Sequence, residues 1–292
     1  MLKLSTENMR LYYSLGREES FNALADIGYD GVDYSIPCAK LNPERDFFKA
    51  DVVTFEKYFL EDKRYAETSG LEIFQTHAPF PVYTEGHPEL FDRNIEAVKK
   101  TVVATKILGC DLMVVHGAMP HWKSEYDKKE FRDINYYYLE KILPVAEEYG
   151  VKIALENMPG VRFKKDEFEP VTSQPETIIE YIDMMNSPYL VACLDTGHAN
   201  CAGVSAGGFA RKLGSRLKAL HIHDNFAKID AHTLPYTGTV NWEDFAESLK
   251  EIDYKGALSL EWRVGGFPED YMLEAEKFAF QTLKKFRQDN EL

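Results

Sequence analysis

The sequence predicts an α/β fold, a single (β/α)8 TIM barrel in which eight parallel strands form a ring inside eight helices. Three observations predict it. Short apolar runs alternate with amphipathic stretches of helical spacing along the whole chain. Most of these stretches end at a glycine just before the next apolar run, which is a common helix stop. The 292 residues are enough for eight such units, because a closed barrel of this kind needs about 250 residues.

The expected elements follow from this alternation in chain order. The eight strands are expected at Leu2–Ser5, Gly31–Ile36, Leu71–Thr76, Asp111–Val115, Val151–Leu155, Val191–Leu194, Leu217–Leu220 and Ala257–Leu260. The eight helices are expected at Glu18–Ile27, Val53–Ser69, Leu90–Leu108, Tyr136–Tyr149, Pro175–Met185, Phe209–Leu217, Trp242–Ile252 and Glu269–Phe286. Strands that alternate with helices are parallel and are joined by right-handed crossovers, so they form one sheet.

One domain is expected over residues 1–292, because no linker rich in proline, glycine or serine and no low-complexity tract divides the chain. An open doubly wound sheet is the alternative architecture. The glycine-rich phosphate loop that is typical of such a sheet does not follow the first expected strand. The closed barrel is therefore preferred.

Composition and charge narrow the class of protein. Hydrophobic residues make up 45% of the chain, which is enough for a sizeable core. A formal net charge of -14 and a pI near 5.1 argue against broad attraction to nucleic acid or to anionic membranes, although a local basic groove stays open. Residues 1–10 hold no long apolar run, so neither a signal peptide nor a membrane anchor is expected.

The cysteines indicate a reducing compartment. None of them follows CxxC spacing, and each lies in or beside an apolar run, where a reduced thiol packs as a small hydrophobic group. They are Cys38, Cys110, Cys193 and Cys201. The protein is therefore expected in the cytoplasm.

Ionisable side chains stand where the apolar runs end. The clearest example is Val191–Leu194, which is followed at once by Asp195 and then by His198, with Gly197 allowing a tight turn between them. The other strand ends carry His77, His116, Glu156, His221, His223 and Glu261. In a barrel the carboxyl ends of all strands meet at one mouth, so these side chains are expected to be neighbours.

Some of these residues also have a structural explanation. Asp195 is a good N-cap for a following helix, and His77 and His116 stand before residues typical of turns. Glu156 and Glu261 are harder to explain in this way, because a carboxylate inside a barrel costs several kcal/mol unless it is paired or bound to a metal. A shell of carboxylates and imidazoles suits Mn, Mg or Co, and also catalytic Zn with open positions.

Four runs of the sequence resemble the xylose-isomerase-like TIM barrel superfamily. They are Leu194–Asn200, Ala154–Asn157, His221–Asp224 and Leu258–Glu261, and they occur in the order that the superfamily shows. The resemblance spans essentially the whole chain. The superfamily includes sugar and sugar-phosphate isomerases and epimerases, ketose 3-epimerases, inosose dehydratases and the endonuclease IV group of DNA-repair enzymes. The resemblance therefore implies the barrel and a metal site, and it leaves the substrate open.

The resemblance also implies ligands and roles. The core metal ligands would be Glu156, Asp195, His221 and Glu261. His221 is chosen over His223 because the family places its ligand three residues before an acid, here Asp224. Glu156 and Glu261 would exchange a proton with the substrate. Additional ligands, as in the endonuclease IV group, would be His77, His116, His198, Asp230 and His232. Apart from the resemblance, the side chains expected to bind the substrate at the mouth are those of His77, His116, His198, His223 and Arg263, and pairing with a nearby acid stays an alternative for Arg263.

The leading hypothesis is a divalent-metal-dependent isomerase or epimerase of a ketose or sugar phosphate. Two glutamates would transfer the proton through a metal-stabilised enediolate. The alternative is a zinc-dependent phosphodiesterase of the endonuclease IV type that acts on abasic DNA, which the full set of nine ligand positions keeps open. A noncatalytic barrel that binds a sugar is a third hypothesis, but buried charges retained without a metal would destabilise it.

The expected partner is a small-molecule sugar or sugar phosphate. Nucleic acid is disfavoured as a partner, no membrane is expected, and a homo-oligomer stays open. One ion per chain would favour the sugar enzyme, whereas two or three zinc ions would favour the nuclease.

Overall fold

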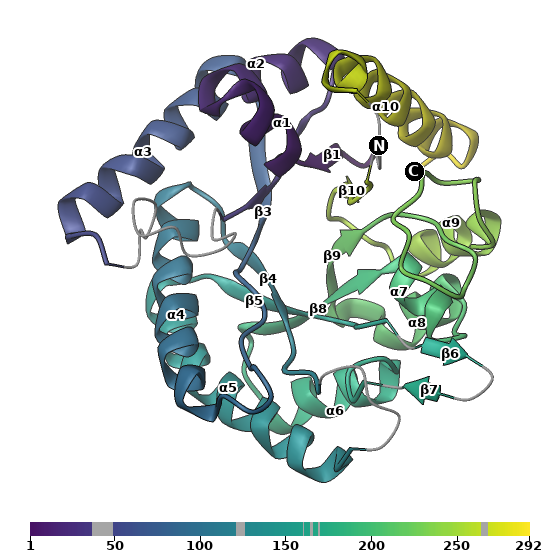
Figure 1. Cartoon of the computed structure of the whole chain (residues 1–292). Helices are drawn as coiled ribbons and strands as arrows, with labels where there is room; N and C mark the ends of the chain where they lie inside the picture. The colour runs from purple at the N-terminus through teal and green to yellow at the C-terminus, as the bar shows by residue number, and fades with distance from the viewer. Residues whose placement is uncertain (37–48, 121–125, 160, 164–165, 169, 264–267) are drawn as a thin grey trace.

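Eight parallel strands form the ring at the centre of the molecule, and helices surround it (Figure 1). The computed structural model describes residues 1–36, 49–120, 126–159, 161–163, 166–168, 170–263 and 268–292. In sheet order the strands are β10 (Leu258–Leu260), β1 (Leu4–Glu7), β2 (Gly31–Ser35), β3 (Glu72–His77), β4 (Leu112–His116), β5 (Lys152–Glu156), β8 (Leu190–Asp195) and β9 (Leu217–His221). Past the end of β9, Ile222 bridges Leu260 in parallel and so closes the ring. The predicted barrel is confirmed.

A helix follows each strand of the ring and lies on its outer side (Figure 1). These helices are α2 (Arg17–Ile27), α3 (Val52–Ser69), α4 (Phe91–Ile107), α5 (Lys128–Tyr149), α6 (Pro175–Met185), α8 (Ala206–Leu213), α9 (Trp242–Glu251) and α10 (Met272–Asp289). Gly28, Gly70 and Gly150 end α2, α3 and α5 in left-handed conformations. The predicted glycine stops are thus confirmed at these three helices.

Further elements lie in the connections that follow the strands. The helices are α1 (Met9–Leu15) before α2 and α7 (Thr196–Cys201), which begins directly after β8. Between β5 and α6, β6 (Val161–Phe163) pairs with β7 (Asp166–Phe168) as an antiparallel hairpin. Short 3-10 turns are η2 (Pro88–Leu90), η3 (Gly214–Arg216) and η4 (Glu269–Tyr271). Because these additions to the barrel include α7, they help to shape the mouth.

The predicted start of one helix and the predicted end of one strand were wrong. α5 begins at Lys128 rather than Tyr136, because Asp127 caps it by accepting hydrogen bonds from two backbone N–H groups of its first turn. β1 ends at Glu7 rather than Ser5. The longer reach of β1 brings Glu7 to the mouth of the barrel.

The predicted helix Phe209–Leu217 was also misplaced. α8 covers Ala206–Leu213, because the Ser205 side chain caps it by accepting from the N–H of Gly208. The chain then turns through η3 before β9. The small residues at positions 206–208 lack the apolar spacing that identifies a helix, so the sequence pattern missed this start.

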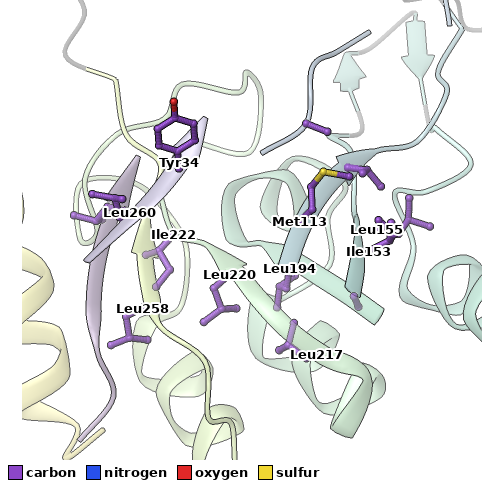
Figure 2. Packing of buried hydrophobic residues seen from close by; sticks show 14 of the residues in the cluster. Tyr34, Met113, Ile153, Leu155, Leu194, Leu217, Leu220, Ile222, Leu258 and Leu260 are labelled. Atoms are coloured by element: carbon purple, nitrogen blue, oxygen red, sulfur yellow. The ribbon is translucent and has the colours of Figure 1, made fainter. Parts of the chain in front are cut away.

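The main hydrophobic core lies between the ring and the helices, and a smaller one lies inside the ring. Figure 2 shows part of the main core, with Met113, Leu155, Leu194 and Leu260 among its buried residues. The inner cluster contains Val114, Ala154, Val191, Cys193 and Ala219. Since side chains alternate along a strand, the residues two positions beyond this inner cluster face the same interior, now at the mouth.

Two further expectations concern thiols and membranes. Cys110, Cys193 and Cys201 are buried and free, as predicted, whereas Cys38 lies outside the described residues. Across the described part of the chain, no helix combines the length and apolar character needed to cross a bilayer.

Candidate metal centre

The predicted residues meet around the carboxyl ends of the strands, where they make up three groups of possible ligands, and a fourth group adds Cys193 to Glu156 and His221. Within each group, the oxygen and nitrogen atoms that could bind a metal lie within 4.8 Å of one another. The central group is Glu156, Asp195, His221 and Glu261. The β3–β4 group is His77, His116 and Glu156. The loop group is His198, His223, Asp230 and His232. Every residue that the sequence analysis proposed as a ligand therefore belongs to a group.

Glu156, at the end of β5, belongs to both the central group and the β3–β4 group. Its side chain is fully buried and is surrounded by imidazoles. Oε2 lies 3.2 Å from His116 Nε2 and 3.5 Å from His77 Nε2. Oε1 lies 3.2 Å from His198 Nδ1 and 3.2 Å from His221 Nδ1. One carboxylate thus connects the β3–β4 group to the central group.

Buried atoms without hydrogen-bond partners show that these residues fit a cation. Among the described residues, the atoms in this state include both Glu156 oxygens, His221 Nδ1, Glu261 Oε2 and Asp230 Oδ1. Each buried polar atom left unpaired costs about 1–3 kcal/mol. The separations of 3.2 to 3.5 Å around Glu156 suit a shared ion, since two ligands about 2.1 Å from a tetrahedral zinc lie about 3.4 Å apart. Carboxylates with imidazoles also suit Mn, Mg or Co.

Backbone carbonyl groups fix the orientation of three imidazoles. The Nδ1–H groups of His77, His198 and His232 donate to the carbonyl oxygens of Ala78, Asn157 and Glu261, each at 2.8 Å. Because the proton then resides on Nδ1, the Nε2 atom keeps its lone pair. This is the arrangement typical of histidines that bind a metal through Nε2.

Asp195 caps α7 and also enters the central group. Its Oδ1 accepts a hydrogen bond from the His198 backbone N–H at 2.6 Å, which is the capping role considered for it. His223 Nε2 lies 2.9 Å from the Asp195 carboxylate. Asn157 holds the Asp195 backbone by hydrogen bonds to its N–H at 2.8 Å and to its C=O at 3.0 Å. The structural and chemical roles of Asp195 are therefore compatible.

Gly197 serves a purpose different from the tight turn that the sequence suggested. It lies within α7, and a Cβ at this position would be 1.9 Å from Cε1 of the His223 ring. A glycine is needed because the helix packs directly against this imidazole. The tight turn expected at Gly197 was wrong, because the residue lies within a helix.

The connection between β9 and α9 carries Asp230 and His232, and Asp224 fixes its shape. The buried Asp224 carboxylate accepts hydrogen bonds at 2.8 to 3.1 Å from the backbone of Asn225, Gly238 and Val240 and from the indole of Trp242. Its backbone N–H and C=O both pair with Thr233. This connection therefore holds two members of the loop group without regular secondary structure.

Two acidic residues at the mouth were not predicted. Asp33 of β2 is buried and accepts a hydrogen bond from His221 Nε2 at 2.9 Å. Glu7 of β1 pairs in register with Asp33, and burial raises its pKa to about 7. In the sequence, each of these two residues is only a charged residue within or just after a short apolar run. Exposed strands commonly show the same pattern, so it does not identify a site residue.

The charges of the site depend strongly on one another. Burial by itself would raise the pKa of Glu156, but the imidazoles of His221 and His116 outweigh it and hold that pKa well below its usual range. Burial would lower the pKa of His198, but Asp195 and Asp230 raise it well above its ordinary value. The buried carboxylates and imidazoles thus stabilise one another's charged forms, and metal binding would release protons from the imidazoles that bind it.

The predicted substrate contacts lie around these groups. His77, His116, His198 and His223 are all members of a group, as given above. The Arg263 side chain is exposed, and its backbone N–H donates to the His232 carbonyl at 2.8 Å. Contacts of these five side chains with a substrate stay predictions.

Comparison with known proteins places the chain in a family. Residues 21–282 match the model described as xylose isomerase-like TIM barrel. The chain belongs to this family. An uncharacterised protein of Methanocaldococcus jannaschii is 34% identical over 191 residues, which cover 63% of this chain and 62% of that relative. The match therefore spans less than two thirds of that relative's length.

Relatives in this family differ in the activity that their names state. A D-psicose 3-epimerase of Enterocloster bolteae is 25% identical over 246 residues, 80% of this chain and 73% of that protein. A probable endonuclease 4 of Mycoplasmopsis pulmonis is 27% identical over 190 residues, 62% of this chain and 65% of that protein. The crystal structure of a D-tagatose 3-epimerase-like protein covers 99% of both chains with a TM-score of 0.72 at 24% identity, and it shows the same fold.

Proposed function

We propose that this protein is a divalent-metal-dependent isomerase or epimerase of a ketose, free or phosphorylated. The observation that carries the proposal is the meeting of two glutamates at one imidazole. Glu156 Oε1 and Glu261 Oε2 each lie 3.2 Å from His221 Nδ1, although their strands are far apart in the sequence. Such a pair can remove and return a proton on a substrate held between them. The name of the E. bolteae relative supports the same class of reaction.

The central group supplies the ligands that such a reaction needs. A proton next to a ketose carbonyl is too weakly acidic for an unaided carboxylate, and a bound Mn, Mg, Co or Zn ion would stabilise the negative charge that develops. Glu156, Asp195, His221 and Glu261 would hold this ion. Glu261 has 23% of its side chain exposed, whereas Glu156 is fully buried. We therefore assign the first proton transfer to Glu261, which lies nearer to the solvent.

Hydrogen exchange into a ketose tests this proposal. The protein is incubated in D2O with a panel of free and phosphorylated ketoses, with and without Mn, Mg or Co, and deuterium next to the carbonyl is followed by NMR. We expect metal-dependent incorporation with at least one ketose, and its loss in Glu261→Gln. Metal-loaded protein that exchanges no proton in any of these sugars would contradict the proposal.

A zinc-dependent phosphodiesterase is the second candidate, and the two additional groups favour it. The β3–β4 group shares Glu156 with the central group, and the loop group lies beside Asp195. Clustered zinc ions can activate water and stabilise the leaving oxygen of a phosphodiester. Incubation of the zinc-loaded protein with duplex DNA containing an abasic site tests it. Strand cleavage with two or three zinc ions per chain would favour this candidate over the sugar enzyme.

A further inference from the structure

We infer that Asp33 is a positioning residue for the metal centre, which fixes the tautomer and orientation of His221 from across the barrel. The inference rests on the proposed central group and adds a residue that does not touch the ion. β2, which carries Asp33, is not a neighbour of β9, which carries His221. The contact between them therefore crosses the interior of the ring.

The hydrogen bond determines which nitrogen of His221 faces the central group. His221 Nε2 lies 2.9 Å from Asp33 Oδ2, and both side chains are almost completely inaccessible to solvent. A carboxylate oxygen accepts, so the imidazole proton resides on Nε2 and the lone pair on Nδ1. His221 Nδ1 is the atom that lies 3.2 Å from both Glu156 and Glu261. Rotation of the ring or a change of tautomer would remove the lone pair of Nδ1 from the central group.

An irregularity in the sheet places a second partner beside Asp33. The register between β2 and β3 shifts after Val32, so that Asp33 lies opposite Gln75 and not opposite Phe74. Gln75 Nε2 then donates to Asp33 Oδ2 at 2.7 Å and to the Leu220 carbonyl at 3.3 Å. Bulges that redirect a side chain are common next to active sites. The bulge thus gives Asp33 a second partner that holds its carboxylate toward His221.

A second register shift lies beside His221, the other residue of this contact. The register between β8 and β9 shifts after Ala192, and Asp195 then lies opposite His221. Two ligands of the central group are brought side by side by this shift. The first shift thus places a partner of Asp33, and the second places Asp195 beside His221.

The Asp33 carboxylate is unfavourable for the stability of the folded protein. Its Oδ1 is buried and has no hydrogen-bond partner among the described residues. A buried carboxylate with one unpaired oxygen is less favourable than an amide or an apolar side chain of similar volume. The aspartate is explained when its charge is used, because a carboxylate behind a histidine increases the basicity of the atom that faces the metal.

Manganese binding to the metal-stripped full chain tests the inference. Free Mn2+ is measured by electron paramagnetic resonance during titration of the wild type, Asp33→Asn and the control Asp62→Asn. Asp62 is equally buried but pairs with Arg17 in the outer helical layer. We expect Asp33→Asn to weaken manganese binding by about 10- to 100-fold, as removal of such partners usually does. We expect Asp62→Asn to lower thermal stability and to leave the manganese affinity unchanged.

The outcomes separate this inference from the proposed function. A wild type that binds no manganese or zinc would overturn the metal centre itself. A wild type that binds manganese, with Asp33→Asn binding it equally well, would overturn only the role of Asp33. Equal losses in both variants would also overturn it, since general destabilisation would then explain them.

Nitrogen-15 NMR of the wild-type imidazoles gives a readout that needs no variant. In the zinc-loaded protein we expect His221 to carry its proton on Nε2 and to bind through Nδ1. A proton on Nδ1 would overturn the inference even if Asp33→Asn fails to fold.

Discussion

At the scale of single residues, Glu156 has the most contacts with other members of the candidate metal centre. It is fully buried, it connects two groups of ligands, and neither of its oxygens has a hydrogen-bond partner among the described residues. Such a side chain could be predicted from sequence, because a glutamate directly after an apolar strand has no ordinary structural role. The contact of Asp33 with His221 could not, because it joins strands that are not neighbours in the sheet and depends on the closed barrel.

Replacement of Glu156 by glutamine tests its position between the groups. We expect Glu156→Gln to weaken manganese or zinc binding by more than about 100-fold, because two groups lose a charged ligand. Loss of a residue that only hydrogen-bonds to a ligand usually costs less than this. Isothermal titration calorimetry measures the change. Glu276→Gln is the matched control, since Glu276 is also buried but pairs with Tyr29 and Trp262 in the outer layer. Similar metal affinities in the two variants would argue against the assigned role of Glu156.

The raised pKa of Glu7 predicts a pH-dependent stability. Folding raises this pKa from 4.5 to about 7, so the folded state binds more protons than the unfolded state between these values. The contribution of Glu7 to stability is therefore present below pH 4.5 and is lost as the pH rises through about 7. We expect Glu7→Gln to be more favourable relative to the wild type at pH 8 than at pH 5. Urea unfolding of the metal-free proteins at both values measures this, and parallel pH profiles would contradict it.

At the scale of elements, α7 and the β9–α9 connection complete the site that the strands begin. The ends of most strands could be predicted, since apolar runs stop at ionisable residues such as His77 and His116, but the end of β1 at Glu7 could not. Asp230 and His232 lie on an irregular connection with no periodic signal, and only the resemblance to a known family indicated them. The register shifts and the packing of α7 against His223 depend on tertiary contacts, so no local pattern predicts them.

Gly197→Ala tests the close packing of α7. The added Cβ would overlap the His223 ring, so either the helix or the imidazole must move. We expect a loss of about 1–3 kcal/mol in the free energy of unfolding together with weaker zinc binding. Gly70→Ala is the control, because this left-handed residue meets no atom within 4 Å and should lose about 1–2 kcal/mol without a change in zinc binding. Unchanged zinc binding in Gly197→Ala would contradict the account of α7.

At the scale of the whole molecule, a ring of strands gathers buried charges that would be unfavourable if they were not compensated. Acidic residues exceed basic ones over the chain, and the formal net charge is -14. At the mouth, carboxylates and imidazoles from six strands and their connections face one another. The barrel explains why residues so distant in sequence meet, and the length and alternation of the chain predicted this much.

Metal removal should therefore lower the stability of the folded chain. A cation that binds only the folded state adds about 2.7 kcal/mol to its stability when the free ion is at 100 times its dissociation constant. We expect the midpoint of thermal unfolding to rise with the manganese or zinc concentration and to fall on addition of EDTA. Calorimetry measures both changes. A midpoint that is independent of these ions would indicate that the buried charges are balanced without them.

Anomalous diffraction from crystals soaked in manganese or zinc tests the central claim most directly, since it locates the ion itself. We expect a peak between Glu156, Asp195, His221 and Glu261, with additional peaks in the β3–β4 and loop groups if zinc clusters form. Crystals that show these four side chains in place and no anomalous peak among them would contradict the account.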